Sequence, residues 1–454
     1  MSASESSWAP TAEPALSNRA INPSKKSNTL ARIMSKATCG QSKFKEASMA
    51  SIPQHKLAVV NKLGINAFRF MHTKISLTCN FLINLQFYRR NKSVGVYKIA
   101  VFLTFSFVVF NVFSQEKFSN EFLKIGVGAS EMAQGGAVVA RTDNEAAGYW
   151  NPSGLLNTTD QWSVSAMHAE YFAGIAQYDY ASGHYRLNDS LVIGASFIRF
   201  GVDDIPNTTN LVDDQGNFDY NRITTFSQAD YAFLFHIASP LFIENLKVGA
   251  TAKVIYRQFG KLAQAYGFGF DVGAQYQVGK WQLGAVARDV TSTFNAWMFS
   301  LDDSTQAGLL RSGNELPEND LEITLPSLVI GGARTFTFGE HVNLGVEANL
   351  IITTDGERNT LIRTSVASID PALGIETSYK NRVFLRLGAN NIIRESSGVI
   401  EPNTSVQPNL GLGLRIGKWY VDYALTNIGG ANGLQYSNLF TLTYRMPSVN
   451  TGAF

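Results

Sequence analysis

The strongest pattern in the chain is a strict alternation of apolar residues with polar or small ones, repeated many times after residue 160. Between residues 265 and 278, aromatic or aliphatic side chains take the even positions, and alanine, glycine, aspartate or glutamine takes the odd ones. The segments 247–257 and 409–416 alternate in the same way. A period of two residues predicts β-strands with one apolar face and one polar or small face.

The alternation predicts fourteen strands, and many of them have ten or more residues. The predicted ranges are 160–171, 174–186, 190–201, 223–237, 244–258, 265–278, 280–289, 322–338, 341–352, 371–380, 383–391, 406–416, 419–427 and 437–445. Strands of soluble proteins most often have about five or six residues. A tilted strand needs about ten residues to cross a bilayer, which is the length found here.

The predicted connections fall into two groups. Those after even-numbered strands are short, whereas most of those after odd-numbered strands are long, namely 202–222, 290–321, 353–370, 392–405 and 428–436. The connections at 172–173 and 259–264 are the exceptions. Short turns on one rim and long loops on the other are typical of bacterial outer-membrane barrels, where closure lets every backbone amide pair. We therefore predict an all-β fold, a 14-stranded antiparallel transmembrane β-barrel over 160–446, with a short tail over 447–454.

The polar face of these strands is rich in glycine rather than in charge, which predicts that another backbone approaches it closely. The glycines are at 249, 267, 269, 273, 284, 345, 388, 411 and 413. The candidate for filling the lumen is the N-terminal segment 115–159. We expect it to form a hatch, with a short helix at 129–134 and a turn at Asn151–Gly154.

Aromatic residues near the predicted strand ends indicate a girdle at each membrane interface. They are Tyr178, Tyr180, Tyr266, Tyr276, Trp281, Trp419, Tyr420 and Tyr444. The alternative is that aromatic residues simply favour strands.

The first part of the chain differs in composition from the rest. Residues 1–98 hold 15 Lys/Arg and 3 Asp/Glu, whereas residues 99–454 hold 23 and 33. A charge-free apolar run at 99–113 follows several basic residues, so 94–114 is predicted to be a secretory signal, with cleavage before Gln115. A buried core helix is the alternative. Residues 1–93 hold both cysteines and are interpreted as an upstream mis-start of translation or a disordered extension.

No catalytic motif stands out, and we expect no enzyme activity, cofactor or metal. His168, His184, His236 and His341 lie in or at predicted strands. A lipid hydrolase with a Ser/His pair stays open, because such pairs assemble in space. The segment 213–219 is only faintly similar to a calcium loop, because it lacks the spacing and the closing glutamate. Nucleic-acid binding has no support, because the predicted mature chain is acidic.

Acidic residues in two long loops form a candidate surface for binding a partner. They are Asp203, Asp204, Asp213, Asp214, Asp219, Asp302 and Asp303. The alternative is a solvated surface beside acidic lipopolysaccharide.

The hatch segment resembles the start of the PorV/PorQ family, which belongs with the FadL-like barrels. The resemblance rests on 118–123, Gly126–Ser130, Gln134–Ala137, Asp143 and Tyr149–Gly154. The hatch motif within it consists of Gly135, Gly136, Tyr149, Trp150, Asn151, Pro152 and Gly154. The chain departs from the family pattern at Glu131–Gln134, where a more apolar stretch is expected.

The resemblance implies a non-enzymatic component of type IX protein secretion in the outer membrane of Bacteroidota, with an association with gliding motility in some members. Its implied partners are secreted cargo proteins with C-terminal signal domains, translocon and attachment-complex proteins, and outer-membrane lipid. The alternative is a FadL-like channel that takes up hydrophobic small molecules. A general porin is disfavoured, because a water-filled pore usually has a more polar interior.

Overall fold

The computed structural model describes residues 119–171, 174–212, 215–311, 313–364, 366–395, 403–426 and 436–447. The predicted extension, signal segment, first hatch residues 115–118 and C-terminal tail beyond 447 lie outside these residues. No helix in the described part of the chain is both long enough and apolar enough to cross a membrane.

The strands form one antiparallel sheet that closes on itself, because β1 pairs with both β2 and β17. The strands are β1 Asp160–Tyr171, β2 Ala176–Asn188, β3 Leu191–Asn207, β4 Thr224–Pro240, β5 Leu246–Phe259, β6 Ala263–Val278, β7 Trp281–Arg288, β8 Thr293–Phe299, β9 Leu321–Thr324, β10 Ser327–Phe338, β11 Val342–Thr353, β12 Ile362–Arg363, β13 Ser368–Tyr379, β14 Val383–Glu395, β15 Asn403–Ile416, β16 Trp419–Thr426 and β17 Ser437–Pro447.

These seventeen segments make fourteen wall strands. Both β7 and β8 pair with β6, so together they form one wall strand. In the same way β9 pairs with β8 and β10 pairs with β7, so these two form the next wall strand. The two-residue strand β12 pairs only with the start of β13. The predicted 14-stranded barrel is therefore confirmed.

The predicted loop at 290–321 is wrong in part, because the wall continues through it as β8 and β9. A kink separates β7 from β8, with positive φ at Asp289 and Ser292. In β7 the buried positions are even, whereas in β8 Thr293 and Asn295 are buried. Across this kink the register against β6 shifts by three residues, from Val272 opposite Ala287 to Phe268 opposite Phe294. This odd shift exchanges the inward and outward faces, which hides the strand from a period-two pattern.

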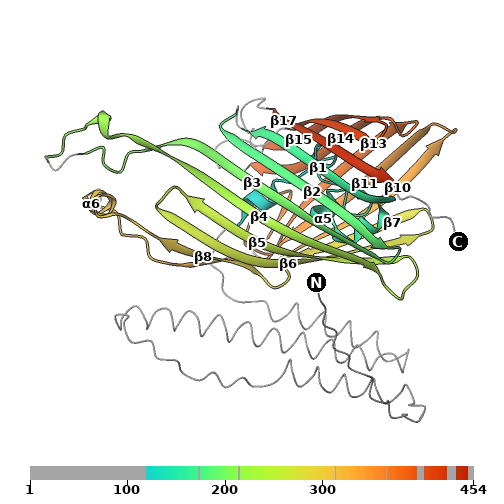
Figure 1. Ribbon diagram of the computed structural model, residues 1–454, viewed down its shortest axis with the longest axis horizontal. Coiled ribbons are helices and arrows are strands. Elements are labelled where there is room, and N and C mark those ends of the chain that lie inside the picture. Colours follow the sequence, from blue (N-terminus) through green and yellow to red (C-terminus); the bar gives the residue numbers. More distant parts are fainter. Residues whose placement is uncertain are drawn as a thin grey trace, which may run out of the picture. The chain divides into compact units, whose positions relative to one another are not determined.

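The barrel has a short-turn end and a long-loop end (Figure 1). At the long-loop end β3 and β4 extend well beyond the other strands (Figure 1), so the predicted loop at 202–222 begins as strand up to Asn207. This end also carries the short helices η3, Tyr220–Arg222, and α6, Asp303–Arg311. Helix α6 was not predicted.

The outer face is a belt of exposed apolar side chains, which suits contact with lipid. It includes Phe233, Phe235, Phe268, Phe270, Leu350, Leu385, Leu410, Leu412, Phe440 and Leu442. Trp281, Trp419, Tyr266 and Tyr276 are 40% to 51% exposed, as a girdle requires. The prediction was wrong for Tyr178 and Tyr180, which are 0% and 2% exposed and pack inside the lumen.

The hatch, residues 119–159, fills the lumen with four short helices. These are η1 Glu121–Lys124, α4 Ala129–Met132, α5 Ala147–Trp150 and η2 Pro152–Asn157. Helix α5 lies within the ring of strands in Figure 1. The predicted helix at 129–134 corresponds to α4, and the expected turn after Asn151 is the capped start of η2.

Candidate functional site: the hatch and its contacts with the barrel wall

Glycines of the wall make room for the hatch backbone. A Cβ built on Gly388 of β14 would lie 2.2 Å from the Gly135 nitrogen, and one on Gly249 of β5 would lie 2.5 Å from the Ser153 nitrogen. On Gly284 of β7 it would lie 2.4 Å from the Val139 carbonyl oxygen. Real Cβ atoms do not approach backbone this closely, so any side chain here would displace the hatch. The prediction that lumenal glycines admit another backbone is confirmed at Gly249, Gly284 and Gly388, whereas Gly267, Gly269 and Gly413 face atoms of neighbouring wall strands.

Asn151 ties the hatch both to itself and to the wall. Its side chain is completely buried, and Nδ2 donates to the carbonyl oxygens of Val139, at 2.8 Å, and Ala274 of β6, at 3.1 Å. Its Oδ1 accepts from the backbone N–H of Ser153, at 3.2 Å, and from the Ser153 hydroxyl, at 2.7 Å. Asn151 therefore caps η2, and Pro152 occupies the first helical turn, where no N–H is needed.

The two aromatic residues of the hatch motif bond the backbone of the earlier hatch segment at Leu123 and Val127. The Tyr149 hydroxyl donates to the Leu123 carbonyl at 2.6 Å, and Trp150 Nε1 donates to the Val127 carbonyl at 2.9 Å. Gly136, with φ +70°, lies under the Trp150 ring, where a Cβ would be 2.8 Å from a ring carbon. The Arg288 guanidinium of β7 lies 4.7 Å from the Tyr149 ring centroid.

Gly135 and Gly154 complete the motif. Gly135, with φ +65°, faces the Ala389 backbone of β14, and a Cβ on Gly154 would lie 2.6 Å from the Thr142 carbonyl oxygen. The motif residues thus lie within the hatch and fix its path across the lumen.

The ion pairs that the described hatch residues make with the rest of the chain reach one side of the barrel. Arg445 of β17 binds Glu145 through two bonds of 2.9 and 3.2 Å, and Arg141 binds Glu376 of β13 at 3.0 Å. Close to the end of β11, Lys124 lies 3.2 Å from Asp355. Hatch residue Glu121 also binds Arg358, at 2.9 Å. Because ion pairs that are partly buried are stronger than pairs at a free surface, this side anchors the hatch.

On the anchored side, neighbouring cations stabilise the ionised form of the Asp355 carboxyl group. Burial alone would raise its pKa, but hydrogen bonds from Arg358 and Lys124 and their positive charges lower the pKa to about 2. The carboxylate therefore stays ionised at every physiological pH.

The opposite side of the hatch meets β1 to β5 through apolar contacts and hydrogen bonds, with no ion pair among the described residues. The charged donors there are Arg186 of β2, to the Thr158 carbonyl, and Lys247 of β5, to the Asn157 side chain. We call the apolar part of this contact the apolar seam, defined by Phe122, Leu123 and Trp150 of the hatch and Tyr171, Tyr178 and Phe200 of the wall. Tyr171 ends β1 and Tyr178 lies near the start of β2, so the seam reaches the long-loop rim. In this state its residues pack against one another.

Glu131 in α4 is a carboxyl group inside the hatch rather than at its edge. Its side chain is 4% exposed and accepts a hydrogen bond from the Asn144 amide. Burial raises the pKa of Glu131 to about 7, and the Asn144 bond and the charge of Arg386 offset this only in part. Part of the hatch population is therefore protonated near neutral pH.

Two Ser–His pairs lie in the wall. Ser196 Oγ is 2.8 Å from His236 Nε2, and His236 Nδ1 is 2.9 Å from Thr251 Oγ1, which donates to the Gly148 carbonyl of the hatch. A Cβ on Gly148 would lie 2.4 Å from the His236 ring, so no substrate fits between them. The second pair, Ser163 and His184, is also buried, at 2.8 Å. Both pairs join strand to strand.

The predicted acidic residues are separated by the structure. Asp203 and Asp204 are exposed on the extension of β3, and Asp213 and Asp214 lie outside the described residues. Asp219 caps η3 and pairs with Arg222 at 3.3 Å. In the described chain no group of three or more His, Cys, Asp or Glu side chains is placed to hold a metal ion.

Asp302 and Asp303 begin the α6 segment, where Asp302 accepts the Thr305 N–H at 2.7 Å. Helix α6 packs against the segment after β3, because Arg311 donates to the Val212 carbonyl at 2.9 Å and Gly308 faces Thr209. The two acidic loops therefore meet, although their acidic side chains are spread over the surface.

Several charged wall residues on the anchored side were not predicted from the sequence. Glu347, Glu376, Arg386, Asp422 and Arg445 lie on strands whose outward positions are apolar. Their signal in the sequence is a charge at an inward position of the alternation. Arg386 joins Glu376, at 2.7 Å, to Asp422, at 2.5 Å.

No protein-family model and no curated protein sequence matches the chain. Among solved structures, the toluene transporter TbuX of Ralstonia pickettii is 14% identical, with 71% of this chain and 98% of that chain covered and a TM-score of 0.43. The CymD monoaromatic hydrocarbon channel is 13% identical, with 72% and 99% covered and a TM-score of 0.45. A Pseudomonas aeruginosa FadL homologue is 11% identical, with 70% and 98% covered and a TM-score of 0.41.

These similarities are too distant to decide function, which has to rest on the chain's own geometry. None of these three structures bears on type IX secretion, so that role stays a prediction. What the geometry provides is a closed barrel with an apolar outer belt and a hatch whose ion pairs, among the described residues, lie on one side only.

Proposed function

We propose that this protein is a FadL-like outer-membrane channel through which hydrophobic small molecules pass when the hatch shifts away from the apolar seam. The observation that carries the proposal is the asymmetry of the hatch contacts. Ion pairs hold the hatch to β11, β13 and β17. Against β1 to β5 it has an aromatic and aliphatic surface that reaches the long-loop rim.

Apolar contact surfaces suit an apolar solute for a simple reason. A hydrocarbon that takes the place of the hatch side chains in the seam keeps the apolar side chains of the barrel wall out of water. An ion in the same place would lose its hydration. A moving hatch would separate first where no ion pairs hold it. With the seam packed, the channel is closed, and this is its resting state. A solute can pass only after the hatch has moved.

The test is uptake of radiolabelled toluene and oleate by cells that do or do not express the protein. Expression should raise the uptake rate severalfold. A disulfide between Ala129→Cys and Thr441→Cys lies on the anchored side, because the Ala129 N–H bonds the Thr441 hydroxyl of β17 at 2.9 Å, and it should leave the gain unchanged. A disulfide between Leu155→Cys and Val192→Cys joins the hatch to β3 on the other side, where these residues pack in one buried cluster, and it should abolish the gain. A reductant should restore it. An uptake rate that is the same with and without the disulfide to β3 would refute a moving hatch.

A second candidate, docking of exported cargo as in a PorV-like component of type IX secretion, is favoured by one observation. The β3–β4 extension and α6 pack together into one projection at the long-loop end. Deleting 205–217 should then reduce the amount of cargo at the cell surface without preventing barrel assembly. Unchanged surface cargo, with normal assembly, would exclude this role for the projection.

A further inference from the structure

The short-turn rim has a gap between β7 and β10. At most junctions between neighbouring hairpins, the residue one beyond the last strand pair donates its N–H to the neighbouring turn. Such bonds run from Gln277 to Asn245, at 3.2 Å, from Lys380 to His341, at 2.7 Å, from Arg415 to Arg382, at 2.7 Å, and from Arg445 to Lys418, at 2.9 Å. They close the rim of the sheet.

The junction of β7 and β10 lacks this bond in the described chain. The last pair is Arg334 with Trp281, so Thr335 is the residue that should close the rim against Lys280. The backbone bonds of the described residues include none from Thr335 to Lys280. Strand β10 nevertheless continues to Phe338, paired on its other side with β11.

Alternate residues of an antiparallel strand direct their N–H and C=O to the same neighbour. Thr335 and Thr337 therefore both point their backbone groups to the side that β7 does not cover. An uncovered strand edge is a template for another strand. Here it is four residues long, from Thr335 to Phe338, which suits a short extended peptide.

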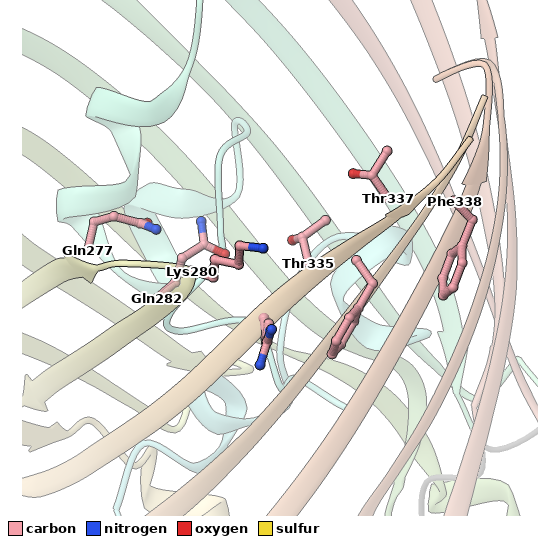
Figure 2. A pocket seen from close by; sticks show the side chains of 8 residues that line it. Gln277, Lys280, Gln282, Thr335, Thr337 and Phe338 are labelled. Atoms are coloured by element: carbon pink, nitrogen blue, oxygen red, sulfur yellow. The ribbon is translucent and has the colours of Figure 1, made fainter. Parts of the chain in front are cut away.

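A cavity of about 540 Å³ lies along this edge, lined by Gln277, Lys280, Gln282 and the end of β10 (Figure 2). Figure 2 shows the side chains of Gln277, Lys280 and Gln282 beside Thr335, with Phe338 on the other side of the strand. The volume falls within the range of ordinary ligand sites, roughly 300–1,000 Å³. The Gln282 Oε1 atom is buried and has no hydrogen-bond partner.

The charge of the gap indicates the occupant. Neither Lys280 nor Arg334 takes part in the ion pairs of the described residues, whereas Arg334 lies over the rings of Trp281, at 5.5 Å, and Phe336, at 4.9 Å. The adjoining turns carry Glu244 and Glu340, and the turns farther along carry Lys380, Arg382 and Lys418, but the charged residues that line the cavity itself are Lys280 and Arg334. A partner that adds a strand here meets positive charge, so it should be acidic.

We propose that the edge Thr335–Phe338 is a docking site for an extended, acidic segment of a periplasmic protein, which adds a strand to β10 and places a carboxylate against Lys280. Backbone bonds to Thr335 and Thr337 would supply affinity, and Lys280 with Gln282 would supply selectivity. The site lies outside the hatch and does not depend on the proposed transport.

The experiment titrates the full chain in zwitterionic nanodiscs with a fluorescent peptide of about seven residues, alternating valine and threonine around one glutamate. Thr337→Pro removes an N–H that no ladder bond uses, as proline does on edge strands. It should weaken binding at least roughly tenfold. Lys280→Gln should weaken it roughly two- to fivefold, whereas the matched rim variant Lys418→Gln should not.

Hydrogen exchange gives a second readout that needs no variant. Without peptide, the amides of Thr335 and Thr337 should exchange much faster than those of Lys380 and Arg415, and the peptide should protect them. Absence of binding at millimolar peptide, or binding that Thr337→Pro leaves unchanged, would overturn the proposal. Protection of these amides by anionic lipid alone, with no response to peptide, would assign the gap to lipid instead.

Discussion

At the scale of single residues, the hatch is positioned by buried polar side chains, and Asn151 is the one that joins most of its parts. Asn151 uses both donors and its acceptor within 3.2 Å, and a buried polar group left unpaired is costly. The sequence marks this residue only as part of an Asn-Pro turn. That it reaches β6, more than a hundred residues away, follows from the barrel closing around the hatch.

Asn151→Ala should loosen the hatch while the barrel stays folded. The substitution leaves the Ala274 carbonyl and the Ser153 N–H without their side-chain partner. Docking of the hatch should therefore become less favourable by about 2–3 kcal/mol. Faster cleavage of the hatch by proteinase K measures this. Asn188→Ala is the control, because Asn188 is exposed and bonds only Ser190. Equal cleavage rates in both variants would contradict the assigned role.

Glu131 predicts a pH dependence. Its pKa is about 7 in the docked hatch and 4.5 as the ordinary value, so the docked hatch binds more protons between these limits. Docking should therefore weaken as pH rises from about 4.5 to about 7, by on the order of 3 kcal/mol, and level off above. Arg386 and Asp422 are the charged groups around it.

The measurement for Glu131 is the rate of proteolytic hatch cleavage between pH 5 and pH 8, corrected for the protease's own pH dependence. Glu131→Gln keeps the shape and the neutral form, so cleavage should then be slow and independent of pH. A wild-type profile that is flat, or a variant that keeps the wild-type slope, would show that Glu131 does not control docking.

At the scale of elements, wall strands fit the hatch through their glycines, and two of them offer a matched comparison. Gly388→Ala places a Cβ 2.2 Å from hatch backbone, whereas Gly332→Ala in β10 meets nothing closer than 3.8 Å. The first should prevent the hatch from docking in most molecules, and the second should leave docking unchanged. Tryptophan fluorescence quenching of Trp150 by acrylamide reports the difference. If Trp150 in Gly388→Ala stays as protected from acrylamide as in the unchanged protein, the wall must be able to move aside.

Also at this scale, the alternation predicts thirteen of the fourteen wall strands well and fails where its phase changes. Between Arg288 and Thr293 the kink exchanges the faces, so β8 looked like loop. The break at Pro326 likewise separates β9 from β10, which the pattern joined. Tyr178 and Tyr180 were misplaced because an aromatic residue suits either a lipid belt or a packed lumen. Pairs such as Arg445 with Glu145 are 300 residues apart and leave no local pattern.

At the scale of the whole molecule, two halves with different chemistry surround the hatch. Ion pairs from β11, β13 and β17 anchor it, whereas β1 to β5 face it largely with aromatic residues and, among the described residues, make no ion pair to it. This division is compatible with a closed barrel that opens along one side. It also implies that the lumen is blocked by the hatch and not by the wall, because the inward wall positions carry many glycines and charges.

Removal of residues 119–157 tests that implication directly. The strand ladder from β1 to β17 closes without the hatch, so the barrel should still form and resist SDS before heating. The freed lumen would expose Glu347, Arg386 and Lys253 to water and should conduct ions. In planar bilayers we expect conductance at least roughly tenfold above that of the full chain, because water-filled barrels of comparable size are pores. Deleting α6, residues 303–311, removes a similar surface element outside the lumen and should leave the barrel closed. If the full chain already conducts like the deletion variant, the hatch does not seal the lumen, and the apolar seam cannot be the route that it controls.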